Sequence, residues 1–214
     1  MNRKTIEKLL YIIFLLISLQ LVRMLYKNIV FQFLDRNLIS DGIVNVIFML
    51  IMIGIMVFII NNKKIELNIF PNKNKKAYII LTILLLAFIV CTLFIAQSFV
   101  FSDILFFFYG SILTIIFEEL IFRGFVWKEL ELNKNNIYAY VITTVLFGLW
   151  HIGYVDTIIW RTSIFNVTEN IGNIMLMKTI TGGVLGVMFG FLRYKTKNVY
   201  SSMLLHALVN TIGK

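Results

Sequence analysis

The sequence predicts an all-α fold, a polytopic transmembrane helical bundle with about seven spans. Of the 214 residues, 59% are hydrophobic and only 14% are charged, and the mean hydropathy is +0.87. A soluble domain of this size is closer to half apolar and a quarter charged, so this composition excludes an ordinary water-soluble globule. The apolar residues also gather in long runs, which is the pattern of a membrane protein.

Seven apolar runs are candidate membrane spans. A hydrocarbon core of about 30 Å requires about 20 helical residues, with a workable range of roughly 17 to 25. The fifth and seventh runs are short, at about 15 to 17 residues each, and we expect them to be buried among neighbours or to lie where the bilayer is thin. The predicted spans are approximately 9–26, 43–60, 78–101, 104–127, 137–153, 174–192 and 199–213.

The distribution of Lys and Arg predicts the orientation of the chain. If the N-terminus is cytoplasmic, about thirteen basic residues fall on the inner side and about five on the outer side. This bias predicts a protein of the cell membrane with its N-terminus inside and its C-terminus outside. The net charge of +9 then serves orientation and contact with anionic headgroups, because no nucleic-acid-binding motif accompanies it. The single cysteine, Cys91, excludes an intramolecular disulfide.

The fourth run carries three ionisable residues, at a depth where such residues are rare and usually functional. They are Glu118, Glu119 and Arg123, in the sequence EELIFRG. Each costs about 2.5 to 3.5 kcal/mol near the centre of a spanning helix. Glu119 and Arg123 are spaced i and i+4 in the favourable order for an ion pair. Glu118 lies about 100° around the helix and is free to move protons, unless the three residues form only an interhelical salt bridge.

Both histidines lie in later apolar runs. His151 ends the sequence FGLWH, and His206 begins the sequence HALVN, which ends at Asn210. In each sequence the first and last residues are spaced i and i+4 and share a helix face. A lone membrane histidine often serves only as a hydrogen bonder in helix packing. The depths of these residues and of Glu118 fall within about 11 Å at 1.5 Å per residue, so helix tilt could bring them together.

The order EExxxR, FxxxH and HxxxN on successive apolar helices resembles the CPBP family. That family groups CAAX prenyl endopeptidases with bacteriocin-processing and bacteriocin-immunity membrane proteins. The motifs fall at residues 118–124, 147–151 and 206–210. The resemblance implies a CPBP-type intramembrane endopeptidase. Residues 105–214 would form its catalytic transmembrane core and residues 1–104 its N-terminal scaffold helices, within one integral membrane domain.

The resemblance also implies a role for each motif residue. Glu118 would be the general base that activates water, assisted by His151. His206 and Asn210 would stabilise the oxyanion, and the other acid and the arginine of the first motif would hold that motif in position. These residue types suit peptide hydrolysis, which needs a base for water, a proton donor for the leaving amine and fixed donors at the developing oxyanion.

No cofactor is favoured, but a metal is left open. If one is present, Glu118, His151 and His206 could form a zinc site with an open water position. The family has been described as metalloproteases, yet it also resembles a glutamate-dependent, metal-free design, and we favour the second. The zinc-binding motif HExxH is absent from the sequence, so the motifs do not decide between the two.

Three hypotheses for function follow. The first is an endopeptidase that cleaves membrane-anchored or hydrophobic peptides in peptide maturation, bacteriocin processing or self-immunity. The second is a non-proteolytic immunity or scaffold protein of the same family that binds a membrane partner. The third is a small proton-coupled transporter, which the lack of a visible inverted repeat disfavours. The expected partners are the bilayer and a peptide, nucleic acid is excluded, and the oligomeric state is left open.

Two features of the sixth run receive structural interpretations. Gly182, Gly186 and Gly190 form a stripe of small residues that favours close helix packing within the chain. Lys178 lies near the outer end of this run, where its side chain can reach the interface, and no site role is assigned to it. The preceding segment 154–173 is predicted to be an interfacial helix, a lid or a simple surface connector.

Overall fold

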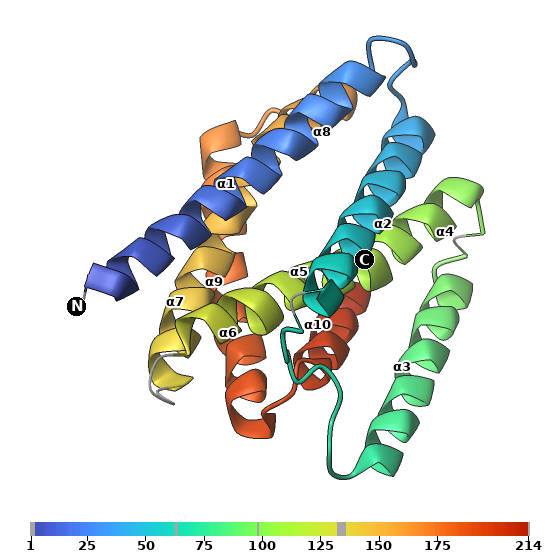
Figure 1. Cartoon of the computed structure of the whole chain (residues 1–214). Helices are drawn as coiled ribbons and strands as arrows, with labels where there is room; N and C mark the ends of the chain where they lie inside the picture. Colours follow the sequence, from blue (N-terminus) through green and yellow to red (C-terminus); the bar gives the residue numbers. More distant parts are fainter. Residues whose placement is uncertain (1–2, 63, 98, 132–135, 214) are drawn as a thin grey trace.

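The computed structural model describes residues 3–62, 64–97, 99–131 and 136–213, and within these residues it contains helices and no strands. Figure 1 shows long helices crossing one another in a bundle. Six described segments are long and apolar enough to cross a membrane, and the chain is therefore a multi-pass membrane protein. These segments are Thr5–Val30, Leu38–Asn62, Lys75–Ile95, Phe101–Leu130, Asn136–Ile164 and Ile171–Thr196.

Four of the predicted runs are single helices, and the first two of these begin well before the predicted residue. They are α1 (Arg3–Val30), α2 (Leu38–Asn62), α3 (Lys75–Ile95) and α9 (Ile171–Thr196). The fourth run is divided. Two π-helical turns interrupt it, so that it consists of α4 (Phe101–Phe108), η1 (Tyr109–Leu113), α5 (Thr114–Glu119), η2 (Leu120–Val126) and α6 (Trp127–Leu130).

The fifth run is longer than the sequence predicts. Helix α7 (Asn136–Trp150) continues through the 3-10 turn η3 (His151–Tyr154) into α8 (Val155–Ile164). Part of the segment predicted as an interfacial helix, lid or connector is thus helix that extends the fifth candidate span. His151 therefore lies in the turn that joins the two helices.

The seventh run is the short helix α10 (Tyr200–Ile212). Its 13 residues are about 20 Å long, which is less than the hydrocarbon core of about 30 Å. It packs among α3, α5, η1 and α9, as expected for a short run. Its start is held by the α2–α3 connection, because the Val199 and Tyr200 amides donate to the Asn68 and Ile69 carbonyls at 3.1 and 2.9 Å.

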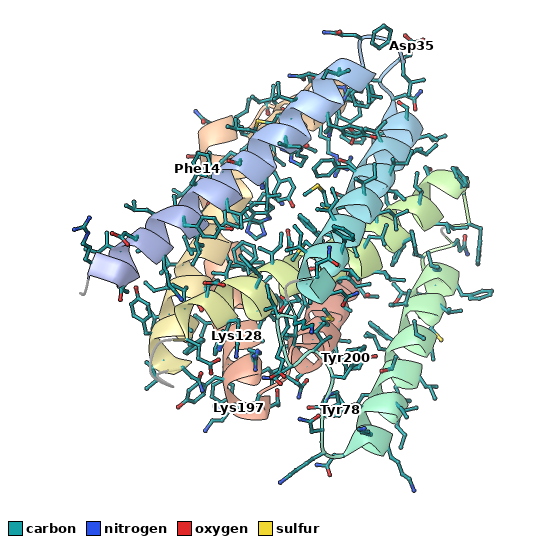
Figure 2. The ribbon with its side chains drawn as sticks, in the orientation of Figure 1. Phe14, Asp35, Tyr78, Lys128, Lys197 and Tyr200 are labelled. Atoms are coloured by element: carbon teal, nitrogen blue, oxygen red, sulfur yellow. The ribbon has the colours of Figure 1, made fainter. Side chains whose placement is uncertain are left out.

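Polarity is inverted relative to a soluble protein. Large apolar side chains such as Phe14, at 70% exposure, point away from the bundle, while several ionisable side chains are buried inside it. Helix α3 is the extreme case, since it contacts α10 and exposes most of its apolar surface (Figures 1 and 2). This distribution matches a hydrocarbon surround, in which polar groups must find partners within the protein.

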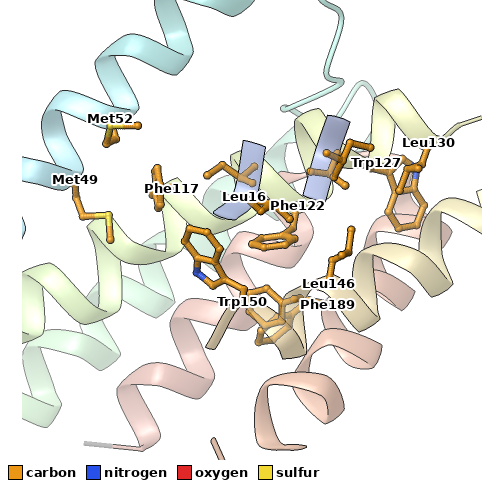
Figure 3. Close-up of a cluster of buried hydrophobic side chains, with 14 of the residues drawn as sticks. Leu16, Met49, Met52, Phe117, Phe122, Trp127, Leu130, Leu146, Trp150 and Phe189 are labelled. Atoms are coloured by element: carbon orange, nitrogen blue, oxygen red, sulfur yellow. The ribbon is translucent and has the colours of Figure 1, made fainter. Parts of the chain in front are cut away.

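The fourth run lies at the centre of the bundle. It crosses the other helices obliquely and contacts α1, α2, α7 and α10 (Figure 1). Residues 117–124 are all buried. Phe122 packs edge-on against Phe147 and Trp150, with ring centroids 5.2 and 5.7 Å apart, in the apolar cluster of Figure 3. This cluster fixes the fourth run against α7.

The stripe of small residues Gly182, Gly186 and Gly190 packs against another helix of the same chain, as the sequence predicts. A Cβ atom on Gly190 would lie 2.6 Å from the ring of Tyr140 in α7, so a larger residue would push the two helices apart. The small residues of α9 let the backbones of α7 and α9 approach closely, as in other membrane helix pairs.

Lys128 and Lys197 lie near the same end of the molecule as the α2–α3 connection, and Asp35 lies at the opposite end (Figures 1 and 2). Lys128, Lys197 and the lysines of that connection are among the basic residues that are predicted to be cytoplasmic. The orientation in the cell stays a prediction.

Cysteine accessibility tests this sidedness. In a Cys91→Ser background, Glu66→Cys and Lys197→Cys should react with a membrane-impermeant maleimide only in inside-out vesicles, because Lys-rich connections stay cytoplasmic. Asp35→Cys should react in intact cells. If Glu66→Cys and Lys197→Cys were labelled from opposite sides, the arrangement of the helices would be wrong. If those two variants were labelled in intact cells and Asp35→Cys only in inside-out vesicles, only the predicted orientation would be wrong.

Candidate active site

A buried ion pair lies in the middle of the fourth run. Arg123 Nη1 donates to Glu119 Oε1 at 3.1 Å, and both side chains are fully buried. Arg123 Nη2 donates to the carbonyl of Gly186 in α9 at 3.3 Å, and the guanidinium lies 4.2 Å from the ring centroid of Phe147 in α7. Because a buried charge is tolerated only with partners of this kind, the pair joins the fourth run to α7 and α9.

The π-helical turns lie on either side of α5 and its two acids. A π turn changes the helical hydrogen-bond pattern, and backbone carbonyls near it need partners from elsewhere. In η1 the Gly110 carbonyl accepts from Asn210 Nδ2 at 2.9 Å, and in η2 the Arg123 carbonyl accepts from Arg193 Nε at 3.0 Å. Side chains of α9 and α10 therefore satisfy the fourth run's backbone beside the first motif.

His206 reaches both carboxylates of the first motif. Its Nδ1 lies 3.0 Å from Glu119 Oε1, and its Nε2 lies 4.0 Å from Glu118 Oε2. An ionised carboxylate only accepts hydrogen bonds, so Nδ1 carries the donated proton. The imidazole also stacks on Phe189, with ring centroids 4.3 Å apart. Glu119 thus orients His206 as well as Arg123, and leaves the far nitrogen of the ring facing Glu118.

One oxygen of Glu118 is held and the other is directed toward His206. Glu118 Oε1 accepts hydrogen bonds from Trp150 Nε1 at 3.1 Å and from the Tyr154 hydroxyl at 3.0 Å. The gap of 4.0 Å between Oε2 and His206 Nε2 is too long for a direct hydrogen bond. A single water molecule can bridge two polar atoms across such a gap.

His151 is held by its own helix and by a glycine of α9. Its Nδ1 lies 2.8 Å from the carbonyl of Phe147. Because a carbonyl only accepts, Nδ1–H is the donor, and a neutral ring then has an unprotonated Nε2. A Cβ atom on Gly182 would lie 2.5 Å from His151 Nδ1, so only glycine at this position leaves room for the ring.

The polar motif residues from three segments of the chain meet at one cavity. Glu118, His151, His206 and Asn210 all line this cavity, whose volume is about 480 Å³. Their catalytic roles stay a prediction, but their convergence is a property of the structure. The other polar residues that line it are Asn45, Tyr109, Thr114, Tyr154, Thr157, Arg161, Lys178 and Thr181.

The side chains at this cavity do not fit a zinc site as they are placed. Among the described residues, no group of three or more His, Cys, Asp or Glu side chains is arranged to hold a metal ion. Two ligands of a tetrahedral zinc lie about 3.4 Å apart at bond lengths of about 2.0 to 2.1 Å. Glu118 Oε2 and His206 Nε2 are 4.0 Å apart, which is wider than this spacing.

Helix α1 supports the segment that carries His151. Gln20 Nε2 donates to the Trp150 carbonyl at 3.2 Å, and Arg23 Nη2 donates to the Gly153 carbonyl at 2.6 Å. Arg23 also forms an ion pair with Asp156 at the start of α8. Residues outside the three motifs therefore hold the backbone on both sides of His151.

A second buried charge cluster joins α1 to α2 beside the cavity. Lys27 Nζ and Arg36 Nη2 each lie 2.9 Å from Asp41 Oδ1, and the Asp41 carboxylate is fully buried. Asn45 Nδ2 donates to Asp41 Oδ2 at 2.9 Å, and Asn45 itself lines the cavity. Helix α2 thus forms part of the cavity wall through Asn45, and α1 is tied to it through the Lys27–Asp41 ion pair.

Sequence reasoning missed the two residues that hold Glu118. Trp150 and Tyr154 are aromatic residues with polar tips, spaced i and i+4 on either side of His151. This spacing beside a motif histidine was the available signal, because a buried Trp N–H or Tyr O–H needs a partner. Sequence reasoning also assigned no role to Lys178, which lines the cavity with Arg161.

Fold and site together define a class of protein, a multi-pass α-helical membrane protein in which one acid and two histidines meet at a cavity. The family model described as Type II CAAX prenyl endopeptidase Rce1-like matches residues 99–212, which include all three motifs. The match covers more than half of the chain, so the chain belongs to this family, and the resemblance to the CPBP family is confirmed. No curated protein and no solved structure matches it.

Removing Arg123 tests the importance of the buried pair. Arg123→Ala should lower the free energy of unfolding by about 3 to 5 kcal/mol, because Glu119 would remain as a buried charge without its partner. Arg3→Ala is the matched control, since Arg3 and Glu7 have the same i and i+4 spacing but are exposed. This control should change stability by less than about 1 kcal/mol. Equal effects in detergent-micelle unfolding would show that Glu119 does not depend on Arg123 for its stability in the interior.

Substitution of Gly182 tests the placement of His151. Gly182→Ala should displace the His151 imidazole and lower stability by about 1 to 3 kcal/mol, because the new methyl group overlaps the ring. Gly54→Ala is the control, since a Cβ there has no neighbour within 4 Å. Imidazole NMR signals of the purified protein report the change. An unshifted His151 signal in Gly182→Ala would show that the ring lies elsewhere.

Proposed function

We propose that the protein is an intramembrane endopeptidase that hydrolyses membrane-associated or hydrophobic peptides with a water molecule activated by Glu118. The observation that carries the proposal is the 4.0 Å gap between Glu118 Oε2 and His206 Nε2, at a cavity that His151 and Asn210 also line. Membership of a peptidase family supports peptide-bond hydrolysis as the reaction.

In the proposed reaction, Glu118 Oε2 accepts a proton from a water molecule in this gap as the water oxygen bonds to the scissile carbonyl carbon. The hydrogen bonds from Trp150 and Tyr154 to Oε1 keep the carboxylate in one rotamer. The carbon–nitrogen bond then breaks, and Glu118 returns its proton to the leaving nitrogen. The products are a carboxylic acid and an amine, as peptide hydrolysis requires.

The oxyanion that forms in this step needs fixed donors. His206, when it is protonated at both ring nitrogens, donates Nδ1–H to Glu119 and Nε2–H toward the oxyanion. Asn210 uses one amide hydrogen for the Gly110 carbonyl, and the amide group carries a second. His151 presents Nε2 as a further proton acceptor. Donors held in advance in a cavity with little water stabilise a developing charge most effectively.

The proposal retains the division of the chain into scaffold helices over residues 1–104 and a catalytic core over residues 105–214. Asn45 of the first part lines the cavity, and Gln20 and Arg23 hold the backbone on either side of His151. The site supports peptide cleavage in general, as in peptide maturation, and nothing in its geometry or in the family match favours bacteriocin self-immunity.

Cleavage of a fluorogenic membrane peptide by the purified protein tests the proposal. Glu118→Gln should lower kcat by about 100-fold or more, because it removes the base. His206→Ala should lower kcat about 100-fold, because it removes an oxyanion donor. Glu66→Gln, an exposed acid in the α2–α3 connection, should leave kcat unchanged.

Three outcomes would contradict this proposal. Full activity in Glu118→Gln would exclude the assigned base. Loss of activity on treatment with a chelator, restored by zinc, would favour a metal-dependent reaction. Absence of cleavage, together with a cellular activity that survives Glu118→Ala, would favour the non-proteolytic immunity or scaffold hypothesis.

A further inference from the structure

Two cations line the cavity beside the residues of the proposed reaction. Arg161 comes from α8 and Lys178 from α9, and no step of the proposed reaction uses either residue. Among the described residues that line the cavity, Glu118 is the only acid. Its Oε1 is already bonded to Trp150 and Tyr154. The part of the cavity wall formed by the two cations is therefore positively charged.

Neither cation has an ion-pair partner among the described residues, whereas three other cations of the bundle each pair with an acid. Arg23 pairs with Asp156, Lys27 with Asp41 and Arg123 with Glu119. Arg161 has a buried Nε atom without a hydrogen bond, as Arg123 also has, but only Arg123 is paired with an acid through another nitrogen. Arg161 and Lys178 are half-buried and line one cavity without an acid partner, so an anion from outside the chain would be the group that pairs with them there.

Lys178 lies close to the reacting groups, and Arg161 lines the same cavity. Lys178 Nζ lies 5.9 Å from the ring centroid of Tyr154, whose hydroxyl donates to Glu118 Oε1. Lys178 is thus near a side chain that holds the proposed base. An extended peptide advances about 3.3 to 3.6 Å per residue, so a group bound at the cations would be only a few residues from the bond at Glu118.

We propose that Arg161 and Lys178 form an anion subsite, which binds a carboxylate of the substrate peptide and so selects peptides with a negative charge near the cleaved bond. This inference rests on the proposed function. A guanidinium and an ammonium together suit a carboxylate, because charge-assisted hydrogen bonds to both are strong. The carboxylate is either the C-terminal one or that of an acidic side chain.

Matched peptides identify the source of the carboxylate. The peptides share one hydrophobic sequence and carry a free C-terminal acid, a C-terminal amide, or an amide with Glu or Gln as the last residue. The wild type should cleave at least one of the acidic forms with kcat/KM about tenfold or more above its neutral counterpart. A preference for the free acid identifies the C-terminus, and a preference for Glu over Gln identifies a side chain.

The variants assign this preference to the two cations. Arg161→Gln combined with Lys178→Gln should abolish the preference, so that acidic and neutral peptides are cleaved with equal kcat/KM. Lys195→Gln, an exposed cation on the same helix as Lys178, should keep it. The same peptides are also tested for binding to Glu118→Gln, so that the subsite is measured without hydrolysis.

Failure of the subsite proposal and failure of the protease proposal give different results. If neutral and acidic peptides are cleaved and bound equally, the subsite proposal is wrong while the protease proposal stands. If acidic peptides bind more tightly but none is cleaved, the subsite stands without the proposed reaction. The third failure concerns lipid. Phosphatidylglycerol vesicles, compared with phosphatidylcholine vesicles, could raise the melting temperature of the wild type but not that of the double variant. If the peptides also show no preference, the site binds lipid phosphate and the peptide assignment is wrong.

Discussion

The Arg123 guanidinium is permanently charged and fully buried within an apolar bundle, and the rest of the site is arranged around it. It needs a carboxylate, carbonyl oxygens and aromatic faces, because the hydrocarbon surround offers no water. Glu119 supplies the carboxylate, and the same oxygen orients His206. One buried charge therefore determines the positions of three helices and, through His206, the geometry in front of Glu118.

The buried polar groups of the N-terminal helices also need partners, and some of these partners lie in the region that the family model matches. The family match begins at residue 99, yet Asp156 within it is paired with Arg23 of α1. Without α1, Asp156 would lose its partner, and the Trp150 and Gly153 carbonyls would lose hydrogen bonds on either side of His151. The N-terminal helices are thus part of the site's structure as well as a membrane anchor.

Composition and run length were sufficient to predict the helical membrane fold, because a span needs a long apolar run whatever its neighbours. Motif spacing also identified Glu118 and His206 as members of one cluster, since few ionisable groups are tolerated at that depth. The support of Glu118 by Trp150 and Tyr154 depends on the packing of α7 against the fourth run, which no local pattern encodes. Arg23 and Lys27 are two of the five basic residues assigned to the outer side from the charge distribution, the others being Arg36, Arg161 and Lys214, yet both are buried, Arg23 against α8 and Lys27 against α2.

The π-helical turns have a consequence for how side chains on the fourth run are ordered. An α-helix rotates about 100° around its axis per residue, and a π-helical turn rotates less per residue. Every residue after a π-helical turn is therefore rotated back relative to its position in a regular α-helix. A helical wheel drawn through Phe101–Leu130 as one regular helix therefore assigns the wrong faces beyond Tyr109, and again beyond Leu120. The positions of this run that face lipid and those that face inward therefore follow a different register in each of the segments α4, α5 and α6.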